Sequence, residues 1–232
     1  MFQYFHNRLF SPQSRFRSLL IVTSLSSCVF LSGCNYFILL GYLIGGPPSI
    51  APDFDEQTGN SMTDKDVTVA VMISAAKEIQ YDMDRVDHEL SKYFSGRLHE
   101  HRIQTVNPQL VHDWMDKNPE WDRPTELGTY YQCTYVIYVD LHEFSLLEKH
   151  SHQLYRGRAE GMVSVYKMDE DFEDGEKIYS KELISVFPLM AARSTDEVSY
   201  QTFKAEYLSR LSEELGRLFY EYYNGDDIPH AM

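Results

Sequence analysis

The chain has 232 residues, of which 43% are hydrophobic and 14% aromatic, a composition that suits a packed core and argues against disorder along the whole chain. Its formal net charge is −14, and it becomes −17 without residues 1–33, which carry three arginines and no acidic residue. A body this acidic would repel a phosphate backbone, which argues against nucleic acid as a partner.

The first 33 residues have the layout of a bacterial secretion signal. A basic segment without acids is followed by an apolar segment, 18–31, that contains several small residues. The tetrapeptide that follows from residue 31 reads LSGC and matches the lipobox, in which small residues precede the cysteine that accepts a diacylglyceryl group. We therefore expect residues 1–33 to be a lipoprotein signal peptide, cleaved between Gly33 and Cys34, and Cys34 to be acylated.

An uncleaved signal anchor is the alternative, since residues 18–46 are apolar enough to cross a bilayer, which takes about 20 residues. After cleavage, residues 36–44 would be too short to span as a helix. They could lie in the membrane interface or pack on protein. The Gly-Gly-Pro-Pro run at 45–48 breaks any helix, and a polar stretch follows it. We expect residues 34–66 to form a lipid-anchored N-terminus and a flexible tether.

From residue 67 onward, alternating strand and helix patterns predict one periplasmic α/β domain, 67–224, with a short tail at 225–232. The near-continuous apolar, β-branched run 67–73 is typical of a buried strand. The next expected elements are an amphipathic helix over 82–98, a short strand over 103–106, a helix over 108–117 capped by Asn107, and a short helix near 125–132.

The second half of the domain predicts strands joined by turns and then a long helix. The expected elements are a core strand over 134–141, a long strand over 154–166, an acidic turn over 169–176, a return strand over 177–187, and a helix that begins at a capping box, 194–197. One face of the strand 154–166 carries small residues that would let the last helix approach closely. The order β-α-β-α-(α)-β-β-β-α predicts a single mixed sheet of about five strands with helices packed on it, in which the last three strands form a meander.

Several stretches of the chain resemble a family of predicted lipoproteins from planctomycete bacteria. The stretches are Tyr42–Pro48, Glu126–Gly128, Tyr135–Leu141, Phe144–Leu146, Tyr155–Ala159, Val163–Tyr166 and Leu218–Tyr220. The likeness covers most of the chain after Cys34 and implies an envelope location and an α/β fold. It supplies no catalytic residues. More loosely, the order of elements is similar to small domains of periplasmic assembly lipoproteins and to the N-terminal domain of TolB, a likeness of topology that says little about function.

Histidines supply the candidate metal ligands. The candidates are two His-x-His pairs and one histidine near two acids: His99 with His101, His150 with His152, and His112 with Asp113 and Asp116. Neither pair lies in a clear strand, which would place both rings on one face, so we expect surface histidines. The acids around His112 indicate a solvated helix face. We expect neither a metal nor another cofactor.

The sequence contains no nucleophile elbow, Cys–His signature or phosphate loop, so we assign no catalytic residue. Cys133 is the only cysteine of the expected domain, which excludes a disulfide there, and its place at the start of a core strand indicates a buried, inert thiol. Asp140 and Glu143 flank a strand end, where α/β sheets often place sites. A role in the turn is the simpler interpretation.

Arg156, Arg158 and Glu160 share the other face of the strand 154–166 and are the residues predicted to bind a partner. The planar fork of arginine makes bidentate contacts and is enriched at binding hot spots. The alternative is that these side chains pair with acids of the same domain across the sheet.

The lack of a catalytic motif favours a membrane-anchored lipoprotein with a non-catalytic binding or adaptor domain. Such a domain would support envelope assembly or transport through an unidentified envelope protein. The alternatives are an envelope enzyme, such as a carboxylate-based hydrolase, and a structural lipoprotein that contacts the cell wall. An enzyme would show a deep pocket with converging polar groups. Asn35 follows the cysteine where Asp would retain the protein at the inner membrane, which weakly favours the outer membrane.

Overall fold

The computed structural model describes residues 40–43, 46 and 49–223. The chain divides into two units, Met1–Pro48 and Ser49–Met232, and the elements named below all belong to the second. The expected signal peptide and Cys34 lie outside the described residues. Within the described ranges, none of the helices combines the length and the apolar character that a membrane crossing requires.

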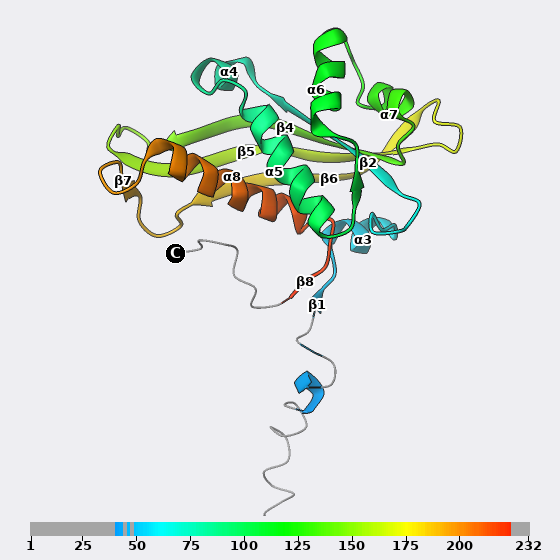
Figure 1. The fold of residues 1–232 in the computed structure, drawn as a ribbon, viewed down its shortest axis with the longest axis horizontal. Helices are drawn as coiled ribbons and strands as arrows, with labels where there is room; N and C mark the ends of the chain where they lie inside the picture. Colours follow the sequence, from blue (N-terminus) through cyan, green and yellow to red (C-terminus); the bar gives the residue numbers. More distant parts are fainter. Residues whose placement is uncertain (1–39, 44–45, 47–48, 224–232) are drawn as a thin grey trace, which may run out of the picture. The chain divides into compact units, whose positions relative to one another are not determined.

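A mixed sheet organises the second unit (Figure 1). Its strand order is β3-β2-β4-β5-β6, and β7 pairs with β5 beside this path. The strands are β2 (Thr68–Ala75), β3 (Gln104–Thr105), β4 (Tyr135–Leu147), β5 (Leu154–Met168), β6 (Gly175–Phe187) and β7 (Arg193–Ser194). The strand β2 runs parallel to β3 and β4, whereas β4, β5 and β6 form an antiparallel meander. The predicted mixed sheet is thus confirmed.

Helices cover both faces of this sheet. They are α4 (Lys77–Asp82), α5 (Val86–Glu100), α6 (Pro108–Lys117), α7 (Thr125–Tyr131) and α8 (Tyr200–Gly216). The helices α5 and α8 pack side by side on one face (Figure 1), while α6 and α7 pack on the other beside β2 and β4. Both faces of β2 are therefore covered, which explains its nearly continuous apolar sequence.

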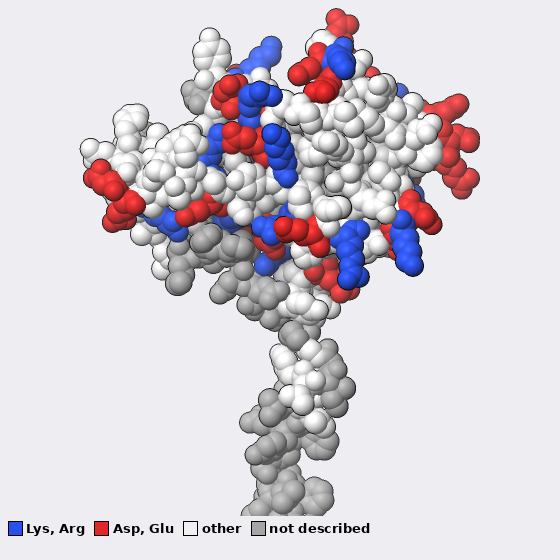
Figure 2. Space-filling view, viewed as in Figure 1, with Lys and Arg blue, Asp and Glu red and all other residues white. Residues whose placement is uncertain are grey.

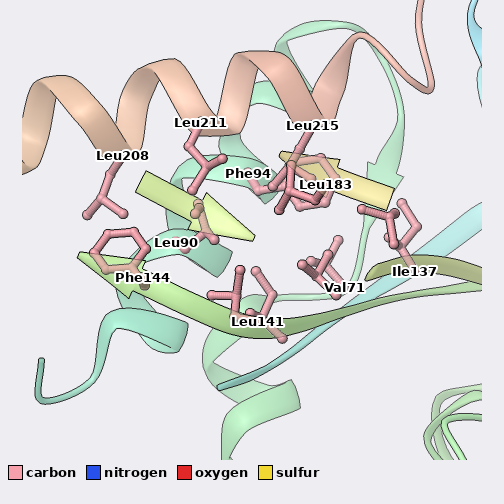
Figure 3. Close-up of a cluster of buried hydrophobic side chains, with 14 of the residues drawn as sticks. Val71, Leu90, Phe94, Ile137, Leu141, Phe144, Leu183, Leu208, Leu211 and Leu215 are labelled. Atoms are coloured by element: carbon pink, nitrogen blue, oxygen red, sulfur yellow. The ribbon is translucent and has the colours of Figure 1, made fainter. Parts of the chain in front are cut away.

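The larger core lies between the sheet and the α5–α8 pair. Figure 3 shows leucines of α8 above α5 and the strands, and the labelled side chains are Leu208, Leu211 and Leu215 of α8, Leu90 and Phe94 of α5, and Val71, Ile137, Leu141, Phe144 and Leu183 of the sheet. The predicted close approach of the last helix to β5 is confirmed, because the Tyr207 ring lies directly over Gly157. A Cβ at Gly157 would lie 2.5 Å from that ring.

The helix predicted over 82–98 begins later than expected. A separate short helix, α4, precedes it, and the helical conformation is interrupted at residues 83–85 before α5 starts at Val86. Arg85 has a φ of 60°, which a regular helix does not allow. Ile79 and Met83 are buried in the larger core, so tertiary packing places the break within an apolar pattern that continues across it.

The predicted capping box at 194–197 is wrong. Ser194 belongs to β7, where it pairs with Leu154 of β5. The last helix starts instead at Tyr200, and the Ser199 hydroxyl oxygen accepts a hydrogen bond from the Thr202 amide at 3.2 Å. The motif at Ser194 therefore lies in a strand and a turn rather than at a helix start.

The stretch expected to be a flexible tether is ordered from Ser49 onward. The strand β1 (Ser49–Ile50) pairs with β8 (Tyr222–Tyr223), and a short helix, α3 (Asp53–Thr58), follows it. Phe54 of α3 is fully buried in the larger core. A single aromatic side chain among polar neighbours thus adds this segment to the domain, which we expected to begin at residue 67.

Candidate functional site

The arginines predicted to bind a partner share one acid of their own domain. Alternation along β5 places Arg156 and Arg158 on the sheet face that points away from α5 and α8. Glu148, in the β4–β5 connection, accepts a hydrogen bond from Arg158, and its second oxygen lies 2.9 Å from Arg156 Nε. The hydrogen bond from Arg158 lowers the pKa of Glu148. Both arginines therefore pair with an acid of their own domain, as the alternative interpretation expected. Glu160, the third predicted residue, is exposed.

Exposed apolar side chains lie on the same sheet face as this ion-pair cluster and in the segment that follows β6. Ile184 of β6 pairs with Glu160 of β5, lies on the same sheet face and is 64% exposed. Met190, in the segment after β6, is 90% exposed, and its carbonyl accepts a hydrogen bond from Arg156 at 3.4 Å. We name as the open sheet face the surface formed by Glu148, Leu154, Arg156, Arg158, Met162 and Ile184, together with the exposed residues 189–190 that follow β6 and contact Arg156 through the Met190 carbonyl.

A second apolar surface lies on α6 and α7. Tyr130 is 66% exposed and contacts Trp114 with ring centroids 6.4 Å apart. Leu110 is also exposed, and its carbonyl accepts a hydrogen bond from the Tyr131 hydroxyl. Figure 2 shows a broad area without charged side chains in the part of the view that α7 occupies in Figure 1. We call Leu110, Tyr130 and Tyr131 the aromatic surface, and Trp114, which contacts Tyr130, is buried.

The two predicted His-x-His pairs do not form a shared site. His99 is exposed, whereas the His101 ring stacks on Tyr220 with centroids 3.5 Å apart. His150 and His152 are exposed in the turn between β4 and β5. Three of the four histidines are therefore exposed as expected, whereas His101 is partly buried against Tyr220.

The expectation that His112 lies on a solvated face is wrong. It is 2% exposed, because α6 turns this residue toward α5, where its Nε2 lies 2.8 Å from the Ser91 hydroxyl. Burial, and secondarily the neighbouring His88, lower the pKa of His112 to about 4. The rings of His88 and His112 stack at 3.6 Å with an angle of 12° between their planes. One donor atom each from Asp87, His88 and His112 lie within 4.8 Å of one another.

Cys133 is buried, and burial raises the pKa of its thiol to about 11. The expected burial of this cysteine is confirmed, and a raised pKa disfavours the thiolate, which is the reactive form. Asp140 is partly exposed near the β-bulge that follows Leu141, and His142 Nε2 contacts its carboxylate at 3.2 Å. The expected strand end is wrong, because β4 continues to Leu147 and Asp140 and Glu143 both lie within it, on either side of the β-bulge.

The described surface contains shallow hollows, of which two are lined by charged residues. One, of about 420 Å³, is lined by β1, α3, β6 and α8 and contains Asp53 and Lys181. Burial acts to raise the pKa of Asp53, but hydrogen bonds from Tyr179, Lys181 and Gln57 outweigh it and lower that pKa. The other hollow, of about 510 Å³, lies at the acidic turn between β5 and β6. Figure 2 shows acidic side chains gathered at this turn, at the right edge of the view.

No protein-family model and no curated protein matches the chain. Solved structures show a distant likeness. A PelC dodecamer from Paraburkholderia phytofirmans is 12% identical, with a TM-score of 0.39, over 75% of this chain and 96% of that chain. The lipoprotein GNA1162 from Neisseria meningitidis is 12% identical, with a TM-score of 0.35, over 64% of this chain and 97% of that chain. A minor lipoprotein from Acinetobacter baumannii is 14% identical, with a TM-score of 0.32, over 66% of this chain and 89% of that chain.

Proposed function

We propose that this chain is a membrane-anchored lipoprotein of the bacterial envelope, whose α/β domain is a non-catalytic adaptor for another envelope protein. The open sheet face is the observation that carries the proposal. Ile184 exposes a large apolar side chain on the sheet face that carries Arg156 and Arg158, and Leu189 and Met190 expose theirs in the segment whose Met190 carbonyl accepts a hydrogen bond from Arg156. Single exposed apolar residues are ordinary, but a group of them bordered by polar side chains is typical of a protein interface.

The ion pairs of this face favour binding in a second way. Glu148 contacts both Arg156 and Arg158, so the two long side chains are already held in one arrangement. A partner that contacts them would order fewer free side chains, which reduces the entropic cost of association. Arginine is also among the residues that most often dominate binding energy.

The lipobox supports the anchored half of the proposal. Acyl chains on Cys34 would contribute about 0.8 kcal/mol per buried CH₂, and several chains together hold a protein stably at a membrane. Fifteen residues lead from Cys34 to Ser49, where the described strands begin. At about 3.5 Å per residue, this segment reaches at most roughly 50 Å. The adaptor would therefore meet partners close to the membrane, for which we propose the outer one.

Affinity capture tests the adaptor role. The tagged lipoprotein would be recovered from detergent-solubilised envelopes as wild type, as an Ile184→Glu/Met190→Glu variant, and as a matched Leu110→Glu/Tyr130→Glu variant on the aromatic surface. We expect the same identified envelope protein with the wild type and the Leu110/Tyr130 variant, and its loss with the Ile184/Met190 variant at an unchanged melting temperature. The reverse pattern, or equal capture by all three, would overturn the role of the open sheet face.

Intact mass spectrometry tests the anchor. We expect a mature chain that begins at acylated Cys34, and a Cys34→Ala variant that keeps residues 1–33 and gains no lipid. A wild-type mass that includes residues 1–33 without lipid would instead support the uncleaved signal anchor.

A further inference from the structure

We propose that Asp87, His88 and His112 form a binding site for a divalent transition-metal cation, with Zn²⁺ as the best match. The first two residues lie in the first turn of α5 and the third lies in α6. Two imidazoles and one carboxylate, with water in the remaining position, are a common donor set for Zn²⁺, and imidazole also suits copper and nickel. This is the one group of at least three such donors that the described residues bring together.

His112 is prepared as a ligand by its surroundings. The Ser91 hydroxyl lies 2.8 Å from His112 Nε2 and donates a hydrogen bond to the His88 carbonyl at 3.4 Å. In the tautomer of His112 that carries its proton on Nε2, the Ser91 oxygen accepts from Nε2–H and the lone pair is on Nδ1. Metal-bound histidines usually have the same arrangement, in which the second ring nitrogen donates to a fixed partner that sets the tautomer.

His88 needs a change of tautomer to bind a cation through Nε2. Its Nδ1 lies 3.4 Å from the Arg85 guanidinium, which only donates hydrogen bonds, so the neutral ring accepts at Nδ1 and carries its proton on Nε2. A cation at Nε2 would shift that proton to Nδ1 and displace this long, exposed contact with Arg85. Asp87 is held beside it, because one carboxylate oxygen accepts the His88 backbone N–H at 2.9 Å. Arg85 opposes a bound cation electrostatically, while the carboxylates of Asp87 and Asp116 favour it.

Binding requires a small rotation rather than a new fold. The two rings stack in parallel at 3.6 Å, whereas a shared Zn²⁺ needs both Zn–N distances near 2.0–2.1 Å with each nitrogen pointing at the metal. The χ2 torsion of histidine has a broad energy profile, and His88 is only half-buried. Its ring can therefore tilt while buried His112 stays in place.

Zinc titration of the purified full-length lipoprotein in detergent tests the site. After removal of metal with a chelator, we expect one Zn²⁺ per chain by calorimetry and elemental analysis, and a melting temperature that rises with Zn²⁺ concentration. His88→Ala and Asp87→Asn change partly exposed residues and should abolish this binding. Ser91→Ala should weaken it by about 10- to 100-fold, as loss of a partner behind a ligand does.

The exposed histidines of the β4–β5 turn provide the matched control. A His150→Ala/His152→Ala variant should bind Zn²⁺ like the wild type. The proposal is overturned if wild-type protein binds no stoichiometric Zn²⁺, if His88→Ala binds as tightly as wild type, or if only the control variant loses binding. One further result would also refute the site. If His88→Ala is less stable than the wild type, and the wild type does not respond to Zn²⁺, then the stacked rings of His88 and His112 are only a packing contact.

Discussion

Glu148 is the single acid that contacts both Arg156 and Arg158, so its charge state controls the open sheet face. Its pKa is lowered in the folded protein from the ordinary value of 4.5. A carboxyl group with a depressed folded pKa stabilises the fold above its unfolded pKa, and the contribution is lost as pH falls through the folded pKa. The ion pairs should therefore be complete at neutral pH and absent in acid.

We accordingly expect Glu148→Gln to lower the melting temperature at pH 7, because it leaves two arginines without their acid. As the pH falls below 4.5 and through the lowered folded pKa of Glu148, the difference from wild type should shrink, because the wild-type carboxyl group becomes protonated. Thermal unfolding of both proteins across this range measures the effect. A difference that stays constant with pH would show that Glu148 acts through packing and not through its charge.

The two serines near the start of α8 give a second test at the residue scale. Ser199 caps the helix through the Thr202 amide, whereas Ser194 lies in β7. We expect Ser199→Ala to cost about 1 kcal/mol of unfolding free energy. Ser194→Ala should change it by less than about 0.5 kcal/mol. Chemical denaturation distinguishes the two, and the opposite ranking would restore the capping box as the start signal.

At the scale of elements, the contact between β5 and α8 determines how closely helix and sheet pack. We expect Gly157→Ala to destabilise the protein by about 1–3 kcal/mol, because the new methyl group meets the Tyr207 ring at 2.5 Å. Gly96→Ala is the matched control, since a Cβ there meets no atom within 4 Å and alanine favours the helix α5 by about 0.5–1 kcal/mol. Denaturation curves that moved both variants in the same direction would contradict this packing.

The sequence predicted those elements whose pattern depends on local periodicity. The strands β2, β5 and β6 and the helix α6, with its Asn107 cap and Pro108, lie close to where they were expected. The errors share one cause. The break before α5 and the start of α8 depend on contacts between residues far apart in the chain, and a local pattern does not contain them.

The candidate sites also differ in whether a local sequence pattern could predict them. Sequence reasoning placed Arg156 and Arg158 together because both lie on one strand, and the structure adds that they share Glu148. The group containing His88 and His112 was missed, since 24 positions separate the two histidines and each is surrounded by acids that indicate a solvated helix. Only the packing of α5 against α6 brings the rings into contact.

At the scale of the whole molecule, the N-terminal boundary of the domain depends on how much the contacts of its first residues stabilise the fold. Phe54 contacts the rings of Tyr135, Tyr179 and Phe219 with centroids 5.7–5.9 Å apart, and its backbone amide donates to the Leu218 carbonyl at 3.0 Å. These contacts lie in the larger core and join α3 to the sheet and to the segment after α8. Loss of α3 should leave a cavity lined by aromatic rings.

A chain that begins at Ser49 should therefore unfold in one cooperative transition and be more stable than a chain that begins at residue 61. We expect the difference in unfolding free energy to be at least about 3–5 kcal/mol, which is the usual cost of removing a buried phenylalanine side chain. Phe54→Ala in the full-length protein should reproduce most of that loss, because the substitution keeps α3 and removes only its core contact. If both shortened chains melted at the same temperature, residues 49–60 would act as a tether after all, and the domain would begin near residue 67 as the sequence pattern indicates.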